Sequence, residues 1–294
     1  MAMRNSAARA FALPLLFAAA LPAGAQSTGL DAHARSSIIY VNPDPLGPTQ
    51  VLQNADSIDY TGPTFAGQTA TGNVAIAGAT ASGRSSANFG TLGAYSAVTV
   101  VNPGGLDPTG TRQGVADGWG TWSDAVTITR VGVPTGTPID IRVDLVIHVA
   151  DVSVLPSGWA ISVAQVSFAS NGMVWCLSQA SPSHYGCGAG TLPLTVGRND
   201  ISFVTQMATG ANTFAATLTA STVVEAYSNT VAFSSSALAD AMNTAHSYYT
   251  ALAPDTTLQS ASGHVYAPVP EPATWASLLV GLGLVSLRRR RLAH

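Results

Sequence analysis

Two aspartates are the first candidates for chemistry, because two carboxylates on one face of a strand can bind Ca²⁺ or act as an acid and a base. Asp140 and Asp144 lie in the run Ile139–Val149, where Ile, Val or Leu occupies every odd position. This alternation predicts a strand with one buried and one exposed face. Four residues of strand separate the two Cα atoms by about 13 Å, too far to share one metal ion. With Arg142 between them, we expect a solvated face with local Asp–Arg pairing.

Trp119 and Trp122 are candidates for binding rather than for catalysis. They lie in a glycine-rich segment, flanked by Asp117 and Asp124, that predicts a turn. Exposed tryptophan rings in such a turn would form a platform for carbohydrate. The alternative is that both rings pack in the core or at its edge.

Cys176 and Cys187 are the two cysteines of the chain. In an oxidising compartment they would pair, and the bridge would stabilise the fold by roughly 3 kcal/mol. A free or reactive thiol and a metal site are the alternatives. His184 lies close to Cys187, but no matching Cys/His pair completes a zinc-type ligand set. We therefore expect a disulfide, and we expect no metal and no other cofactor.

No group of residues forms a recognisable catalytic motif. The sequence contains no Gly-x-Ser-x-Gly elbow, no His-Glu-x-x-His and no P-loop. The six histidines occur singly, and Glu225 and Glu271 are the only glutamates. We therefore expect a protein that is not an enzyme, with a secreted hydrolase that uses aspartates alone as the alternative.

The body of the chain is acidic and sparsely charged. The basic residues are all arginines, and half of them lie at the two ends. Residues 26–269 contain six arginines and 14 acidic residues, a net charge of −8. Nucleic-acid binding needs clustered cations that meet the phosphates, so we expect no nucleic-acid partner.

Alternation of apolar and polar residues dominates this body and predicts many short strands separated by turns. Asn171-Gly172, between two apolar runs, is the strongest hairpin signal. The expected strands, besides Ile139–Val149, are Tyr95–Val101, Asp124–Val131, Trp159–Phe168, Met173–Leu177, Ile201–Met207, Phe214–Tyr227 and Leu258–Tyr266.

Two stretches are ambiguous. Gly67–Ala97 consists largely of Ala, Gly, Ser and Thr, which fits either thin strands or an irregular surface layer. The alanine content of Ser236–Ala251 favours a helix, but Asn243, Thr244 and the pair of tyrosines at 248 and 249 oppose it.

The N-terminus has the three parts of a secretory signal peptide in the expected order. Arg4 and Arg9 supply the positive charge, and Phe11–Leu21 supplies the apolar run. Ala23 and Ala25 fit the small-residue cleavage rule. A buried N-terminal helix is the alternative. We expect residues 1–25 to be removed and the mature chain to be exported.

The C-terminus combines a proline–acid motif, an apolar run and an arginine cluster. As a helix, the apolar residues 273–287 would span about 22 Å, less than the roughly 30 Å hydrocarbon core of a bilayer. By the positive-inside rule, the cluster holds the C-terminus in the cytoplasm and leaves the body outside. The sequence therefore predicts a short transmembrane helix over these apolar residues. The cluster comprises Arg288, Arg289, Arg290 and Arg291.

This tail resembles the PEP-CTERM sorting signal in its motif Val269–Ala276, its apolar run with Gly281-Leu-Gly283, and its terminal arginines. The resemblance implies that an exosortase reads Pro270, Glu271 and Pro272 and removes the tail during transit to the surface. It also implies a host with two membranes that produces exopolysaccharide, and a tail (residues 273–287) that crosses the inner membrane only transiently. A weaker similarity to such anchored β-proteins covers Ser86–Tyr95, Trp122–Thr127 and Ala239–Ala245, and implies a strand, not a helix, for the last of these.

These observations predict an all-β chain with three parts: a signal peptide (residues 1–25), one antiparallel, jelly-roll-like β-sandwich (26–267) and a sorting signal (268–294). We expect a structural or adhesive component of an exopolysaccharide matrix or biofilm at the cell surface. Its expected partners are the exosortase and exopolysaccharide. The alternatives are a carbohydrate-binding module that uses Trp119 and Trp122, and a secreted hydrolase.

Overall fold

The regular structure consists of strands throughout the part of the chain that can be described. The computed structural model describes residues 28–41, 50–61, 67–76, 78–102, 111–155, 159–168, 172–181, 187–227 and 233–266. Within these ranges no helix is long and apolar enough to cross a membrane. The predicted cleavage site at Ala23 and Ala25, the PEP motif, the apolar tail and the arginine cluster lie outside them.

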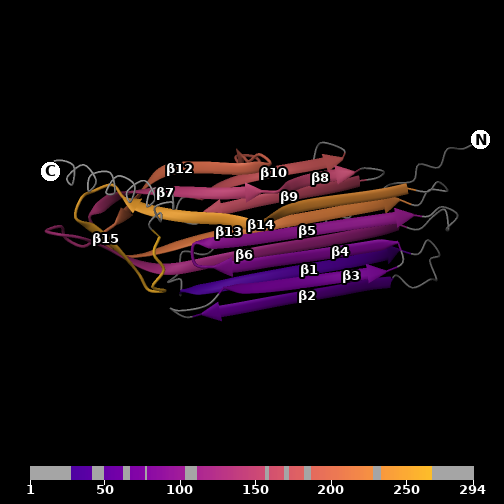
Figure 1. The fold of residues 1–294 in the computed structure, drawn as a ribbon, viewed down its shortest axis with the longest axis horizontal. Coiled ribbons are helices and arrows are strands. Elements are labelled where there is room, and N and C mark those ends of the chain that lie inside the picture. The colour runs from indigo at the N-terminus through magenta and orange to yellow at the C-terminus, as the bar shows by residue number, and fades with distance from the viewer. Residues whose placement is uncertain are drawn as a thin grey trace, which may run out of the picture.

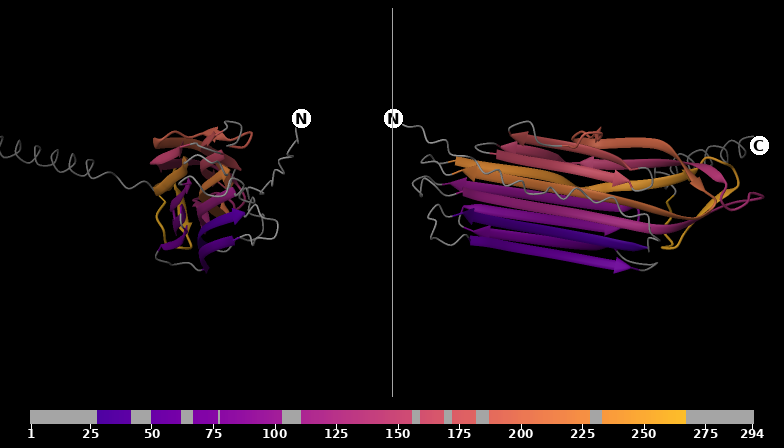
Figure 2. Two further views of the ribbon diagram at one scale, coloured as in Figure 1. Left: turned by 90° about the vertical axis from the view of Figure 1, so that its right-hand side faces the viewer. Right: turned by 180° about the vertical axis from the view of Figure 1, so that it is seen from behind.

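The strands form two sheets that face each other along their length (Figures 1 and 2). In the first, sheet A, β15 (Thr256–Ser260) extends the pairing of β6 at one end of the molecule. The main path of sheet A is, in order, β11 (Leu192–Pro193), β10 (Met173–Ser181), β9 (Trp159–Phe168), β13 (Gly210–Tyr227), β6 (Thr111–Arg130), β1 (Gly29–Val41) and β2 (Gln50–Thr61).

In the second sheet, sheet B, the short strand β8 (Asp151–Leu155) pairs with β14 beside the main path. That path is, in order, β12 (Gly197–Ala208), β7 (Pro138–Val149), β14 (Phe233–Ala251), β5 (Thr91–Asn102), β4 (Ala79–Asn88) and β3 (Gln68–Ile76). Among the described strands, only β10 and β11 pair in parallel. The predicted all-β, antiparallel arrangement is confirmed, whereas the jelly-roll connectivity stays a prediction.

Several sequence patterns predicted their elements correctly. Strand β7 alternates between exposed and buried residues along nearly its whole length, as its period of two requires. Strand β9 has the predicted bounds, and it pairs with β10 as a hairpin. Gly172, in the turn between them, has φ of +66°, a left-handed conformation that glycine adopts without steric cost.

Two ambiguous stretches are resolved as strands, and one reading of the sequence needs correction. Ser236–Ala251 is not helical, because it belongs to the long strand β14 between β5 and β7. Gly67–Ala97 is not an irregular surface layer, since it contributes β3, β4 and the start of β5. The glycine-rich segment around Trp119 is not a turn, because it lies inside β6, where β1 and β13 flank it on both sides.

Two clusters of buried side chains fill the space between the sheets. The larger cluster reaches the end where β15 lies and contains the big rings of Trp122, Phe168, Trp175, Phe214, Tyr249 and Tyr266. The smaller contains Ile38, Val98, Val100 and Val224 among several alanines. The inward positions between these clusters carry small residues: Ser36, Gly83, Ser85, Ser96 and Gly118.

At these small residues the two sheets approach each other backbone to backbone. An ideal Cβ placed on Gly118 of β6 would overlap the carbonyl oxygen of Arg84 and lie 2.6 Å from that of Tyr95. On the facing strand, a Cβ on Gly83 would overlap the carbonyl oxygen of Asp117 and lie 2.7 Å from that of Arg35. Sheets that interdigitate side chains normally stand about 10 Å apart, so glycine here sets a closer spacing.

A buried carboxylate lies beside the aromatic cluster. Asp124 of β6 is fully buried and accepts hydrogen bonds from Ser260 Oγ (2.6 Å), Ser262 Oγ (2.6 Å) and Tyr266 Oη (2.8 Å). The backbone N–H of Ser262 donates a fourth, at 3.1 Å. These four donors compensate for the loss of water around the carboxylate. They also fasten the segment after β15 to the core.

Acid is expected to weaken the fold through two half-buried histidines beside the β4–β5 turn. Burial lowers the pKa of both His246 and His264 from the usual 6.5. The charge of Asp124 acts in the opposite direction on the pKa of His264, but burial has the larger effect. Below pH 6.5 the unfolded chain therefore binds protons that the folded chain does not. The free energy of unfolding should fall as pH drops from 6.5 through the lowered pKa values.

Urea denaturation between pH 7 and pH 5 tests this expectation. The double variant His246→Gln/His264→Gln should show a flatter dependence on pH than the wild type, and His148→Gln is the control because His148 is exposed on β7. An equal slope in the double variant and the wild type would show that these two rings do not cause the acid sensitivity.

Candidate functional site

The outer face of sheet A carries an aromatic ring within rows of polar side chains, and we call this area the Trp119 face. Directly paired residues of neighbouring strands point to the same side of a sheet. The register therefore places three rows across β1, β6, β13 and β9. The rows are Asp31–Thr121–Thr217–Ser167, His33–Trp119–Thr219–Gln165 and Arg35–Asp117–Ser221–Val163.

The centre of this face is the indole ring of Trp119, which is partly exposed. The imidazole of His33 stacks on it with ring centroids 4.6 Å apart and planes 10° apart. His33 in turn contacts the carboxylate of Asp31. His33 comes from β1, on one side of β6. Thr219 of β13 and Gln165 of β9 lie on the other side of Trp119.

The polar groups around the ring are held by one another. Arg35 Nε donates to Asp117 Oδ2 at 3.1 Å, and Ser221 Oγ donates to Asp117 Oδ1 at 2.6 Å. The hydroxyls of Thr121 and Thr217 lie 3.0 Å apart in a hydrogen bond. The charges of Arg35 and Asp117 therefore balance, and the face presents mainly hydroxyl and amide groups beside one ring.

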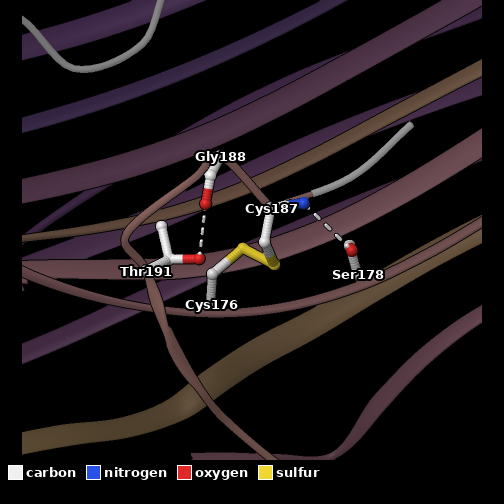
Figure 3. The surroundings of a disulfide bond; sticks show 5 residues. All are labelled: Cys176, Ser178, Cys187, Gly188 and Thr191. Carbon is white, nitrogen blue, oxygen red and sulfur yellow. Dashed lines mark hydrogen bonds between the residues drawn. A yellow bond between two sulfur atoms is a disulfide. The ribbon is translucent and has the colours of Figure 1, made fainter. Parts of the chain in front are cut away.

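The disulfide bounds this face on the side away from His33. Cys176 pairs with Gln165 in the register, so it continues the row of Trp119 onto β10, about 14 Å away across three strand spacings. It bonds to Cys187, with 5.8 Å between the Cα atoms, which confirms the predicted disulfide (Figure 3). Cys187 N also donates to Ser178 Oγ at 3.2 Å, and Thr191 Oγ1 to the carbonyl of Gly188 at 2.9 Å.

Removal of the disulfide is expected to lower the free energy of unfolding by about 3 kcal/mol, because the open chain regains loop entropy. The double variant Cys176→Ser/Cys187→Ser should show this loss in urea denaturation. A reductant should destabilise the wild type by a similar amount and leave the double variant unchanged. Equal stability of the reduced and oxidised wild type would contradict a stabilising role.

The structure separates the two tryptophans that the sequence grouped as a platform. Trp122 is 1% exposed, and its ring packs on Tyr266 at 5.4 Å and on Tyr249 at 6.3 Å. It therefore cannot contact a glycan on the surface, so the platform is wrong for Trp122 and the alternative, packing in the core, is correct. Trp119 lies an odd number of residues away on the same strand and consequently points to the outer face.

The aspartates of β7 are placed as the sequence indicated. Arg142 Nε donates to Asp144 Oδ2 at 2.9 Å, and Gln206 of β12 donates to Asp140 Oδ1 at 3.2 Å. In the described part of the chain, no group of three or more His, Cys, Asp or Glu residues is arranged to hold a metal ion.

The buried Asp124 network was not foreseen. A signal for it exists in the sequence, because Trp122, Asp124, Val126 and Ile128 alternate on one face of β6 and the carboxylate is the exception among them. A carboxylate at a core position requires nearby donors, and the serines and tyrosine after β15 supply them.

Comparison with known proteins bears on the tail more than on the sandwich. No curated protein matches the chain in sequence. A chain from a structure of the infectious bursal disease virus Gx strain shows a likeness at 10% identity and a TM-score of 0.11, over 90% of this chain and 72% of that one. A likeness at that level carries no argument about fold or function.

The family model of the PEP-CTERM protein-sorting motif matches residues 268–291. The matched segment contains Pro270, Glu271, Pro272 and the arginine cluster, so the predicted PEP-CTERM sorting signal is confirmed. The chain thus carries the sorting motif of exported proteins that an exosortase system processes and directs to the cell surface or the extracellular space.

Proposed function

We propose that the mature protein is a structural or adhesive component of an exopolysaccharide matrix, and that its Trp119 face contacts a sugar chain. The host would be a bacterium with two membranes, and the role would not be enzymatic. The observation that carries the proposal is the partly exposed indole ring among hydroxyl and amide groups. The sorting motif supplies the delivery of this face to the outside of the cell.

The chemistry of the face matches that of a pyranose. The C–H groups on one side of a sugar ring pack against an aromatic face, while its hydroxyls need donors and acceptors around that contact. Thr219 and Gln165 lie on the side of Trp119 away from His33 and provide both kinds of group. Arg35 and Asp117 neutralise each other, and the carboxylate of Asp31 adds a negative charge, so the face favours a neutral over an anionic segment of polysaccharide.

Loss of the ring is expected to weaken sugar binding. The variant Trp119→Ala should bind immobilised glycans about tenfold less tightly than the wild type, a loss of 1.4 kcal/mol. Tyr95→Ala is the matched control, because Tyr95 is an aromatic residue on the outer face of the other sheet, under Arg84. Equal binding by Trp119→Ala and the wild type, or no binding by either protein to any glycan of an array, would rule out the proposed face.

The delivery step has its own test in the host. A strain whose protein lacks residues 268–294 should lose the protein from its surface and matrix fractions, and biofilm formation should fall. Unchanged surface retention together with unchanged biofilm would contradict the matrix role. Trp119→Ala should leave delivery intact and reduce only the retention in the polysaccharide, which separates the two steps.

A further inference from the structure

The segment Ser260–Tyr266, which we call the strap, joins the sandwich to the sorting motif. It begins at the last residue of β15 and ends at the last described residue of the chain (Figure 1). The backbone N–H of Ala261 donates to the carbonyl of Ala125 on β6 at 2.8 Å. On the other side of the core, the N–H of Tyr249 on β14 donates to the carbonyl of Tyr266 at 2.9 Å. The strap therefore bridges sheets A and B.

The end of the strap is a core residue and not a surface linker. Tyr266 is 4% exposed, and its ring lies 5.4 Å from Trp122, 5.8 Å from Phe214 and 5.0 Å from Tyr249. These three rings belong to β6, β13 and β14. The strap can dock only after these three strands have come together, because each of them contributes one wall of the site.

Asp124 makes docking of the strap cooperative. The hydroxyls of Ser260, Ser262 and Tyr266 all donate to the same carboxylate oxygen, Oδ2. Burial, and then the charge of Asp124, raise the pKa of Tyr266 well above 10, so its hydroxyl keeps its proton and remains a donor. Release of the strap exposes this carboxylate and an aromatic residue in one step.

The sorting motif follows at a very short distance along the chain. Its match begins at Pro268, and three residues separate Tyr266 from Pro270. An extended chain advances at most about 3.6 Å per residue, so Pro270 lies within about 14 Å of Tyr266 while the strap is docked. An enzyme that reads Pro270–Pro272 must therefore work directly against the folded sandwich.

We propose that the docked strap restricts the access of the exosortase to the Pro-Glu-Pro motif, so that processing proceeds mainly through molecules whose strap has undocked. When local opening and closing are fast compared with cleavage, the rate of cleavage follows the population of the open form. The strap contacts then set the rate at which the tail is removed. This inference rests on the sorting motif and is independent of the sugar-binding proposal.

A spacer gives the cleanest test, because it leaves every contact of the strap intact. Twelve Gly/Ser residues inserted between Ala267 and Pro268 preserve the whole matched motif and move it away from the sandwich. In the full chain expressed in its host, pulse-chase labelling should show tail removal at least tenfold faster with the spacer than without it. An unchanged rate overturns the proposal.

A second experiment removes the main contact of the strap and distinguishes its undocking from global unfolding. Tyr266→Ala should accelerate processing at least tenfold in the chain without the spacer and have little effect in the chain with it. Phe203→Ala is the control, because Phe203 packs on Phe168 and Trp175, away from the strap. Acceleration by Phe203→Ala equal to that by Tyr266→Ala would show that global unfolding controls access, and would overturn the proposal.

Discussion

Gly118→Ala is expected to destabilise the protein by at least about 3 kcal/mol, because overpacking on this scale cannot be absorbed by a side chain. The added Cβ would overlap the carbonyl oxygen of Arg84 and lie 2.6 Å from that of Tyr95. Both atoms belong to strand backbones, which can move only if the sheets separate. Urea denaturation of the purified protein measures the loss.

Two controls isolate the steric cause. Gly132→Ala adds the same carbon in open space at φ of +73°, so its cost should be confined to about 1–2 kcal/mol of backbone strain. Ser96→Ala removes an oxygen that is buried without a hydrogen-bond partner from the same small-residue layer, and it should be neutral or stabilising by up to about 1 kcal/mol. A cost for Gly118→Ala no larger than that for Gly132→Ala would contradict the close approach of the sheets.

Asp124→Ala is expected to cost about 3–5 kcal/mol, because it leaves one buried and two half-buried hydroxyl donors without their acceptor. The hydroxyls of Ser260, Ser262 and Tyr266 lose their shared partner, and the Tyr266 ring loses the bond that orients it. For a domain of this size, such a loss corresponds to a fall in Tm of about 10 °C. Differential scanning calorimetry gives the measurement.

Asp140→Ala is the matched control, since Asp140 is exposed and its side chain accepts one bond from Gln206. Its effect should stay within about 0.5 kcal/mol. Tyr266→Phe removes one of the four bonds to Asp124 and keeps the ring, so it should cost about 1.5–3 kcal/mol. If Asp124→Ala were no more costly than Asp140→Ala, the carboxylate would have no role in holding the strap.

The sequence predicted those strands whose inward residues are large and whose outward residues are polar. Ile139–Val149 and Trp159–Phe168 became β7 and β9 with nearly the predicted bounds. Strand β1 escaped notice, although Leu30, Ala32, Ala34, Ser36 and Ile38 do alternate. Alanine and serine give too little contrast in hydrophobicity for the period of two to be recognised.

The same reason explains why Gly67–Ala97 was ambiguous. Its small residues each bury little apolar surface, so the sequence left both thin strands and an irregular surface layer open. They form strands because the opposite sheet comes close enough for backbones to touch at Gly83, Gly118 and Gly120. That spacing depends on glycines more than thirty residues apart along the chain, and no local pattern contains it.

For the candidate site, the sequence identified several of the residues but did not predict how they are arranged in space. The sequence identified Trp119 as a binding candidate and Cys176 and Cys187 as a pair, and the structure places the disulfide at the edge of the Trp119 face. It could not supply His33, which stacks on Trp119 from a strand more than 80 residues away. Glycines at 118 and 120 suggested a turn around Trp119, whereas they are there for contact between the sheets.

A fluorescence titration shows whether the Trp119 face binds a sugar chain. Purified protein is titrated with exopolysaccharide prepared from the host, while the tryptophan emission is recorded. We expect a saturable change that arises from Trp119 and that disappears in Trp119→Phe, with Tyr95→Phe behaving as the wild type. Trp122 and Trp175 are buried and should not contribute to it. Saturable binding of unchanged affinity in Trp119→Ala, measured by co-sedimentation with the same polysaccharide, would contradict this expectation.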